Sequence, residues 1–371
     1  MSEQKNITTS AISLLKGMIA IPSFSKEENN VADLIESFLH ENKVVTNRLA
    51  NNVYALNQHF NPAKETILLN SHHDTVKPDK GYTNDPFTPT LADGKLFGLG
   101  SNDAGGSLVS LIATFIHFYS AQDLPFNLVL AATAEEEISG KNGVELLLND
   151  DSFLACLNGS MITGALVGEP TQMQMAVAER GLLVVDAVSH GKAVHAARQE
   201  GINAIDIAIE DIQTIRSTIF DKISSFTGKT NATVTVIETE NKAHNVIPAS
   251  CKFIIDIRVN EQYNFEEILQ ILQAKLKSIL TPRSFRLKST MIPMEHPIVK
   301  AGLKLGLSHY GSPTTSDKAL MDFPALKIGP GDSARSHTAD EYIYITEIEN
   351  GIEGYIQLLN ETAILMQNKT V

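Results

Sequence analysis

Residues 66–76 read TILLNSHHDTV, a short apolar run followed directly by two histidines and an aspartate. A run of this kind is typical of a central, buried strand. An apolar run followed by acidic residues recurs at 127–137, NLVLAATAEEE, and at 164–169, GALVGE. Helical segments are expected between these runs, at 107–119 and 142–148, so strands and helices alternate. This alternation predicts an α/β fold whose sheet is mostly parallel, with helices on both faces.

Ionisable side chains gather at the ends of these predicted strands. They are His72, Asp74, Glu136, Glu137 and Glu169. In a parallel sheet the carboxyl ends of the strands lie at one edge, where ligands bind. Adjacent carboxylates after a buried strand repel one another, so a bound cation explains the acidic run better than a solvated loop does. His72 with Asp74 two residues later matches a metal ligand and the carboxylate that orients it, although an isolated His-x-Asp is more simply an exposed turn with a capping aspartate.

Two further candidates lie on glycine-rich loops. Asp103 stands in GLGSNDAGGS and His337 in GPGDSARSHTADEY. Taken alone, Asp103 before a helix is more simply an N-cap, so the argument depends on the whole set of residues. Hard carboxylates with two imidazoles suit Zn²⁺, Mn²⁺ or Co²⁺. These candidate ligands outnumber the roughly three or four that one zinc uses, which predicts two ions sharing one carboxylate.

The composition excludes several classes of protein. The chain has 371 residues, a formal net charge of −13, 43% apolar residues and 20% charged residues. An acidic chain of ordinary composition is neither a general nucleic-acid binder, an anionic-membrane binder nor a disordered protein. Its two cysteines, Cys156 and Cys251, exclude a disulfide scaffold and are expected to be free thiols. No leader peptide and no long apolar span are visible, so we expect a cytoplasmic protein without a transmembrane helix.

The pattern changes after about residue 175. The next segments alternate or are rich in β-branched residues and are separated by amphipathic helices: strands at 182–188, 233–238 and 253–259, and helices at 203–218 and 265–280. This order predicts a small split βαβ unit. Beyond residue 293 the sequence returns to helix, short strand, loop and a final helix. We therefore predict a domain at 176–292 inserted into a discontinuous domain made of 1–175 and 293–371.

Several motifs occur together in one order: SHHDTV, GLGSNDAGGS, TAEEE, VGEPT, GKAVHAA, HNVIP, DIRV and GPGDS…HTADEY. They resemble, over essentially the whole chain, the M20 family of dinuclear zinc amidohydrolases. The resemblance implies a zinc-peptidase-like catalytic domain with a mostly parallel sheet. It also implies that the inserted α+β domain is a ferredoxin-like lid that dimerises, and that the Asp103–Ala104 peptide bond is cis.

The resemblance implies two metal positions that share a carboxylate. His72 and Glu169 would bind one zinc, Glu137 and His337 the other, with Asp103 between them. Co²⁺ and Mn²⁺ are the alternative ions.

The same resemblance assigns the catalytic roles. Glu136 would be the general base and acid, and Asp74 would orient His72. His195, on the lid, would stabilise the oxyanion in a neighbouring subunit, although without the family it is an ordinary surface histidine. A one-residue slip in the alignment of the acidic run would exchange the roles of Glu136 and Glu137.

Five residues are candidates for substrate binding. Asn245 and Arg258 match positions that hold a substrate carboxylate, and Arg180 is a further candidate, because the planar guanidinium pairs two oxygens at once. Thr315 and Ser316 lie in a Thr-Thr-Ser-Asp turn that resembles the carboxylate-binding turn of desuccinylases. Each has a structural alternative; Arg258, for example, could form a cross-strand ion pair.

The expected reaction is metal-dependent hydrolysis of the amide bond of an N-acylated amino acid, by a hydroxide shared between two zinc ions with Glu136 as base. The GEPT motif and the HTADEY ending resemble acetylornithine deacetylases, which favours N-acetylornithine or an N-acylcitrulline in arginine biosynthesis. Succinyl-diaminopimelate desuccinylase is the alternative, followed by a dipeptidase or aminoacylase and last by a metal-free scaffold. The expected partners are this small substrate and a second copy of the chain, bound through residues 176–292.

Overall fold

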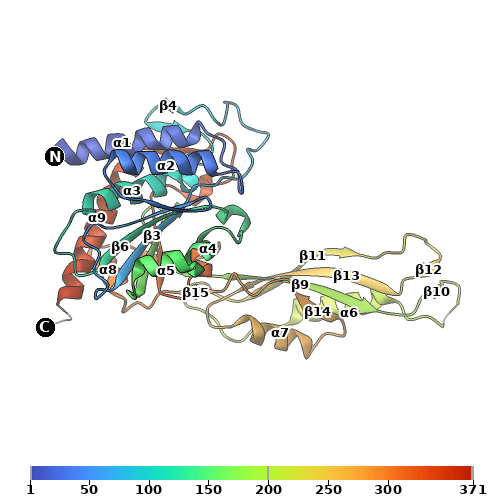
Figure 1. Ribbon diagram of the computed structural model, residues 1–371. Helices are drawn as coiled ribbons and strands as arrows, with labels where there is room; N and C mark the ends of the chain where they lie inside the picture. Colours follow the sequence, from blue (N-terminus) through green and yellow to red (C-terminus); the bar gives the residue numbers. More distant parts are fainter. Residues whose placement is uncertain (1, 199, 369–371) are drawn as a thin grey trace. The chain divides into compact units, whose positions relative to one another are not determined.

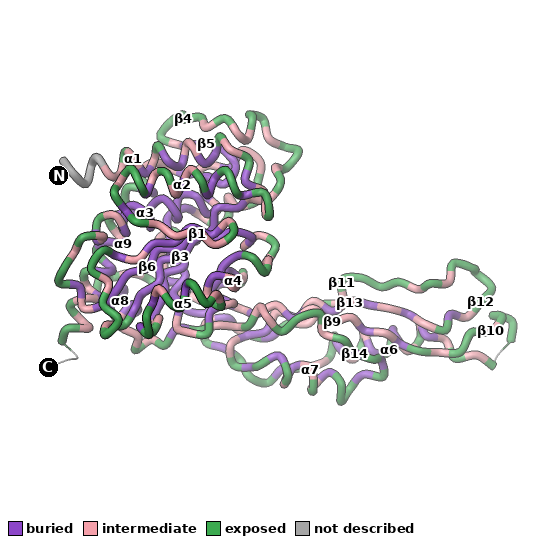
Figure 2. The backbone as a smooth tube through the Cα atoms, viewed as in Figure 1, coloured by how far each residue is buried: buried purple, intermediate pink, exposed green. Residues whose placement is uncertain are grey.

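Four parallel strands form the middle of the main sheet in the computed structural model, which describes residues 2–198 and 200–368 (Figure 1). In spatial order they are β6 (Asn127–Thr133), β3 (Thr66–His72), β7 (Ile162–Val167) and β17 (Ala325–Lys327). Strands β3 and β6 are buried at every residue, as their apolar sequences predict (Figure 2). Antiparallel strands flank this centre: β2 (Asn52–Leu56) and β1 (Asn47–Leu49) beyond β6, and β8 (Met175–Glu179) beside β17.

Helices cover both faces of this sheet. One layer contains α1 (Ser2–Ile19), α2 (Asn29–Glu41), α3 (Gly106–Phe118), α8 (Pro297–Lys304) and α9 (Ile345–Gln367). The other contains α4 (Val144–Asn149) and α5 (Asp151–Leu157), which share a core with sheet residues such as Leu68 and Val129. None of the described helices is long and apolar enough to cross a membrane.

Short elements surround the end of the sheet where β3, β6 and β7 finish. A three-stranded sheet contains β4 (Thr90–Ala92), β5 (Lys95–Phe97) and β18 (Tyr342–Tyr344). Four turns of irregular helix are η1 (Ser101–Gly105), η2 (Glu136–Ile138), η3 (Asp317–Leu320) and η4 (Ser333–Arg335). Of these turns, η1 contains Asp103, η2 contains Glu136 and Glu137, and η4 ends two residues before His337.

The chain divides into two compact units. The first comprises Met1–Val177, Ile292–Tyr310 and Ser316–Val371, and the second comprises Ala178–Met291 and Gly311–Thr315. The short contribution of Gly311–Thr315 to the second unit was not expected from the sequence. Two short strands, β15 (Thr290–Met291) and β16 (His309–Ser312), lie close to these boundaries.

The second unit has the expected ferredoxin-like topology. Its antiparallel sheet has the order β11 (Asn231–Glu238), β13 (Ser250–Val259), β9 (Gly181–His190) and β14 (Ile279–Pro282). Helices α6 (Ala204–Ser217) and α7 (Phe265–Gln273) pack on it, and a small pair of strands contains β10 (Val194–His195) and β12 (Val246–Ile247). The chain order β9–α6–β11–β13–α7–β14 is the split βαβ pattern.

The predicted helix over residues 265–280 is wrong in its second half. The helix ends at Gln273, and Ile279–Pro282 forms β14. Buried Leu272, Leu276 and Leu280 are four residues apart, and this spacing is also that of a helix face, so it favoured a longer helix. The strand forms because residues 279–282 pair with β9, and the Asp211 carboxylate on α6 accepts the backbone N–H groups of residues 277 and 278 just before it.

Both cysteines are free, as predicted. Cys251 is buried and Cys156 is half-buried.

Candidate active site

The register of the sheet brings two predicted site segments to the same place. His72, the last residue of β3, pairs with Thr133, the last residue of β6. The two parallel strands therefore end level with each other, and His73 N–H still donates to the Thr133 carbonyl at 3.0 Å. The chain then turns at Glu135, which has a left-handed φ of 57°, so that Glu136 begins the turn η2 beside His72.

Glu169 reaches the same edge from β7. The Gly168 N–H donates to the Asn70 carbonyl at 2.7 Å, and the Ser71 hydroxyl donates to the Gly168 carbonyl at 2.7 Å. These bonds extend the pairing of β3 and β7 past the last strand residue. As a result, the Glu169 carboxylate oxygen Oε1 lies 3.9 Å from Nε2 of His72.

Asp103 faces both predicted imidazole ligands. Its Oδ1 lies 3.4 Å from Nε2 of His72, and its Oδ2 lies 3.5 Å from Nε2 of His337. His337 also bonds Glu137 Oε2 at 2.9 Å. The expected cis peptide bond between Asp103 and Ala104 is present. The two oxygens of one carboxylate are thus directed to two different histidines, which is the arrangement that a bridging ligand needs.

The residues fit divalent metal ions. The Nε2 atom of His72 is buried and has no hydrogen-bond partner among the described residues. Two ligands of one tetrahedral zinc, each at about 2.0–2.2 Å, lie roughly 3.3–3.6 Å apart. The 3.4 Å and 3.5 Å separations of the two histidines from Asp103 agree with this spacing.

Two groups of side chains could each hold an ion. One is His72, Asp103 and Glu137, and the other is His72, Glu136 and Glu169; within each group the ligand atoms lie within 4.8 Å of one another. Glu136 is therefore near enough to bind metal. It differs from Glu137 because Glu137 is hydrogen-bonded to His337, whereas the Glu136 carboxylate accepts no hydrogen bond from the described residues.

The pKa shifts of the site residues also favour bound cations. Burial raises the pKa of Glu136 well above its usual value and raises the pKa of Glu169 to about 8. The hydrogen bond to Glu137 raises the pKa of His337 to about 9. Burial by itself lowers the pKa of His72, but Asp103 and other carboxylates outweigh it and raise that pKa well above its usual value. A cluster that takes up protons in this way carries excess negative charge, which divalent ions can neutralise.

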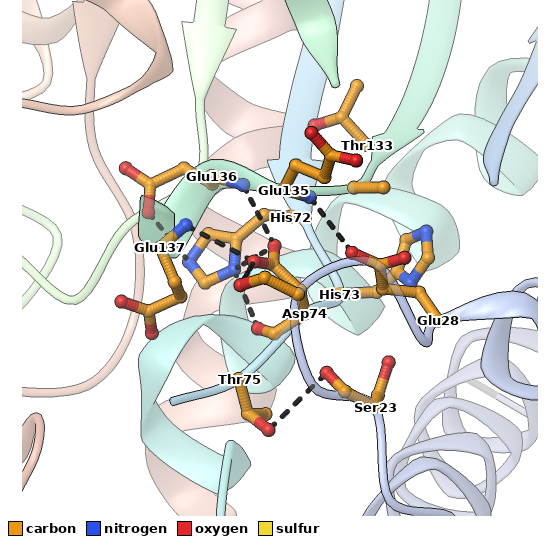
Figure 3. Close-up of polar contacts among 12 residues, drawn as sticks. Ser23, Glu28, His72, His73, Asp74, Thr75, Thr133, Glu135, Glu136 and Glu137 are labelled. Carbon is orange, nitrogen blue, oxygen red and sulfur yellow. Dashed lines mark hydrogen bonds and ion pairs between the residues drawn. The ribbon is translucent and has the colours of Figure 1, made fainter. Parts of the chain in front are cut away.

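Asp74 lies beside His72 and beside the turn that carries Glu136 and Glu137 (Figure 3). Its backbone carbonyl bonds Nδ1 of His72 at 3.0 Å, and its Oδ1 lies 3.4 Å from the same nitrogen. The carboxylate also accepts the backbone N–H groups of Glu136 at 3.0 Å and Glu137 at 3.2 Å, and the Ser25 hydroxyl at 2.6 Å. The predicted contact with His72 is therefore present, and Asp74 additionally fixes the turn that carries the acidic run.

Sequence reasoning missed three buried acids around the site, namely Glu28, Asp317 and Glu341. Glu28 accepts the backbone N–H of Glu135 at 3.2 Å, as Figure 3 shows. Asp317 accepts the Thr133 hydroxyl at 3.0 Å, and burial raises its pKa to about 7. Glu341 accepts backbone N–H groups of the Asp103 loop. Two of them had a signal in the sequence: Glu341 lies in the HTADEY motif, and Asp317 ends the Thr-Thr-Ser-Asp turn, whereas Glu28 had none.

His195, Asn245 and Arg258 lie on or beside strands of the second unit. His195 pairs with Val246 across β10 and β12, and the Asn245 carbonyl accepts the Ala196 N–H at 2.8 Å, so His195 and Asn245 are brought together. Both are exposed. Arg258 forms a two-bond ion pair with Asp256, two residues away on the same strand, at 2.9 Å and 3.2 Å. Arg258 is therefore paired along its own strand, and the cross-strand ion pair considered from the sequence is not found among the described residues.

The remaining predicted substrate residues already have partners within the chain. The Arg180 guanidinium donates to the Thr227 carbonyl. The Thr315 hydroxyl donates to the Arg180 carbonyl at 3.0 Å. Ser316 is 4% exposed. These contacts do not test substrate binding, which stays a prediction for all five candidates.

Known proteins are similar to this chain over most of its length. An acetylornithine deacetylase of Proteus mirabilis is 29% identical over 326 residues, covering 82% of this chain and 81% of its own length. A succinyl-diaminopimelate desuccinylase of Wolinella succinogenes is 25% identical over 370 residues, covering 92% of this chain and 96% of its own length.

A solved structure supports the fold. A dinuclear metal binding peptidase of the M20 family from Bacillus subtilis superposes with a TM-score of 0.73 at 14% identity, covering 98% of this chain and 99% of that chain. The family description "Peptidase family M20/M25/M40" matches residues 68–361, which confirms the resemblance and the fold class expected from the sequence. The chain therefore belongs to the peptidase family M20/M25/M40.

Proposed function

We propose that this chain hydrolyses the amide bond of an N-acylated amino acid with the help of two zinc ions, for which Co²⁺ or Mn²⁺ could substitute. The observation that carries the proposal is the unpartnered, buried Nε2 of His72 facing the carboxylates of Asp103 and Glu169. His72 and Glu169 would hold one ion, Glu137 and His337 the other, and Asp103 both. Metal ions bound there polarise a carbonyl and lower the pKa of a water molecule.

Glu136 is the proposed general base and acid. Its carboxylate accepts no hydrogen bond from the described residues, so its oxygens are free to take a proton from the attacking water and pass it to the leaving nitrogen. The bond from its backbone N–H to Asp74 holds it in place. Proton transfer of this kind contributes roughly 10²–10⁴-fold to the rate.

His195 is the proposed donor to the oxyanion, acting in a neighbouring copy of the chain. Its Nδ1 accepts the backbone N–H of Ala197 at 3.2 Å. In a neutral imidazole the proton is then on Nε2, which is the tautomer that can donate a hydrogen bond to a developing negative charge.

N-acetylornithine, or a related N-acylcitrulline, is the substrate that we propose, in the synthesis of arginine in the cytoplasm. The relative from Proteus mirabilis, named acetylornithine deacetylase, supports this choice. The GEPT motif and the HTADEY ending support it as well, because they resemble those of acetylornithine deacetylases.

Desuccinylation of N-succinyl-diaminopimelate is the second candidate. The relative from Wolinella succinogenes, named succinyl-diaminopimelate desuccinylase, covers more of this chain than the deacetylase does.

The deciding experiment measures release of free amine by zinc-loaded protein from four substrates at equal concentration: N-acetylornithine, N-acetylcitrulline, N-succinylornithine and N-succinyl-diaminopimelate. We expect an acetylated substrate to have the highest kcat/KM, and the Glu136→Gln variant to serve as the inactive control. A preference for a succinylated substrate would replace the first choice of substrate and leave the metal chemistry intact. Release from none of the four would contradict the proposed substrate class.

We also propose that the chain forms a homodimer through its second unit. Strand β11 is at one edge of the four-stranded sheet, and it exposes Val236 and Ile237. An unpaired edge with exposed apolar side chains is a template for pairing with another chain.

A further inference from the structure

The Glu341 carboxyl group is buried and accepts hydrogen bonds from three backbone N–H groups. Its Oε2 accepts the N–H of Gly100 at 2.9 Å, and its Oε1 accepts the N–H groups of Asn102 at 2.8 Å and Asp103 at 2.9 Å. The residue is 2% exposed. Each of these bonds pairs a backbone N–H group with a buried carboxyl oxygen, so together the three bonds hold the loop that carries Asp103.

Glu341 belongs to the segment that carries the other imidazole ligand. His337 lies four residues earlier, and both it and Asp340 have a left-handed φ, of 58° and 53°. Asp340 accepts the backbone N–H groups of residues 83 and 84 and the Thr83 hydroxyl. Residues 337–341 therefore carry one proposed metal ligand, His337, and two carboxylates that accept backbone N–H groups from other loops. Asp340 binds residues 83 and 84, and Glu341 binds the loop that carries the ligand Asp103.

Asn102 forms a second link between the same two loops. Its side-chain oxygen accepts the Asp332 N–H at 2.9 Å, and its side-chain nitrogen donates to the Asp332 carbonyl at 3.0 Å. This link and the one from Glu341 connect the chain immediately before Asp103 with the loop on both sides of His337. Between these two linked loops, Asp103 Oδ2 and His337 Nε2 face each other at 3.5 Å.

The two metal positions depend on these links to different degrees. His72 is the last residue of β3, and Glu169 is held by backbone bonds between β7 and β3, so pairing in the sheet fixes both. His337 lies in an exposed loop and has no such support from the sheet. Loss of the Glu341 contacts should therefore disturb the position bound by Glu137 and His337 more than the position bound by His72 and Glu169.

We propose that Glu341 is a positioning residue that sets the spacing between Asp103 and His337. It thereby strengthens metal binding at the position formed by Glu137 and His337. The proposal rests on the metal-binding role proposed above. Glu341 does not touch the reacting atoms; it acts through the backbone of Asp103.

The test uses the isosteric Glu341→Gln variant. A glutamine retains one acceptor oxygen but directs an NH₂ group at one or more of the three N–H donors. Metal-free wild-type and variant proteins are titrated with Zn²⁺ by calorimetry in a buffer of known zinc affinity, and Co²⁺ absorption spectra report the coordination of each ion. His337→Ala identifies which binding step belongs to the Glu137/His337 position, and Asp340→Asn is the matched control on the same segment.

Mutation of residues that orient metal ligands typically lowers metal affinity by about 10–100-fold. We expect Glu341→Gln to weaken by at least about tenfold the same step that His337→Ala removes, and to weaken the other step, which shares Asp103, by a smaller factor. The Co²⁺ spectrum of that position should change with it, whereas Asp340→Asn should bind both ions like the wild type.

Equal weakening of both steps in Glu341→Gln, or no weakening, would overturn the positioning role. The same weakening in Asp340→Asn would also overturn it, because any anchor of the segment would then suffice. A wild-type protein that binds no ion would contradict the proposed function itself. If the wild type binds two ions and Glu341→Gln binds them equally well, only the positioning role is contradicted.

Discussion

The Asp74 carboxylate accepts the backbone N–H of Glu136 across 3.0 Å, although the two residues follow different strands. The same carboxylate lies 3.4 Å from Nδ1 of His72. Asp74 therefore joins a proposed metal ligand to the proposed general base through one buried group. A side chain with both contacts should affect metal binding and turnover together.

Asp74→Asn should weaken metal binding by about 10–100-fold. The amide NH₂ of asparagine would face the N–H of Glu136 or Glu137, and an unsatisfied buried donor costs about 1–3 kcal/mol of the free energy of unfolding. Zinc affinity and thermal unfolding of the variant measure the two effects. Ser25→Ala removes one donor to Asp74 and leaves its other contacts, so it is the control. Unchanged zinc affinity in Asp74→Asn would contradict the orienting role.

Glu136→Gln and Glu137→Gln should separate the two neighbouring carboxylates. We expect Glu136→Gln to retain both metal ions and lose roughly 10²–10⁴-fold in kcat. Glu137 is bonded to His337, so Glu137→Gln should lose metal at that position. Metal content by elemental analysis and amine release under saturating zinc are the measurements. If the variants show the opposite pattern, the two roles are exchanged.

Removal of metal should destabilise the first unit selectively. Among the described residues, both candidate groups of metal ligands belong to that unit. A ligand present at 1,000 times its dissociation constant stabilises the native state by about 4 kcal/mol, which is lost when a chelator removes it. Scanning calorimetry with and without EDTA should show a lower Tm for the first unit, and zinc should restore it. A metal-free scaffold would give the same curve in both conditions.

The sequence predicted the parts of the site that follow strands. His72, Glu137 and Glu169 stand directly after apolar runs, and parallel pairing places the ends of such runs together. A mostly parallel sheet was expected, but the order β6, β3, β7 was not predicted. Asp103 and His337, on loops, were candidates only as members of the whole set of ionisable residues. Their assignment to particular metal positions came from the family resemblance, because no local pattern relates them.

The supporting acids could not be predicted from local sequence. Glu341 binds the N–H of Gly100, a residue 241 positions away, and Glu28 binds the N–H of Glu135, 107 positions away. A buried carboxylate whose partners are distant backbone groups leaves no periodicity or spacing to detect. Strand β14 was missed for a related reason, because pairing with β9 overrides a helical spacing of leucines.

Ile237→Glu should convert the proposed dimer to a monomer. Ile237 is 52% exposed on the edge strand β11, so a charge there costs little in the isolated chain but opposes burial against a second copy. Ile279→Glu is the matched control, because Ile279 is 60% exposed on β14, at the opposite edge of the same sheet. Sedimentation velocity should show dissociation for the first variant alone. If His195 acts in a neighbouring copy, Ile237→Glu should also lose turnover at unchanged metal content. A monomeric wild type, or equal behaviour of the two variants, would contradict a dimer built on β11.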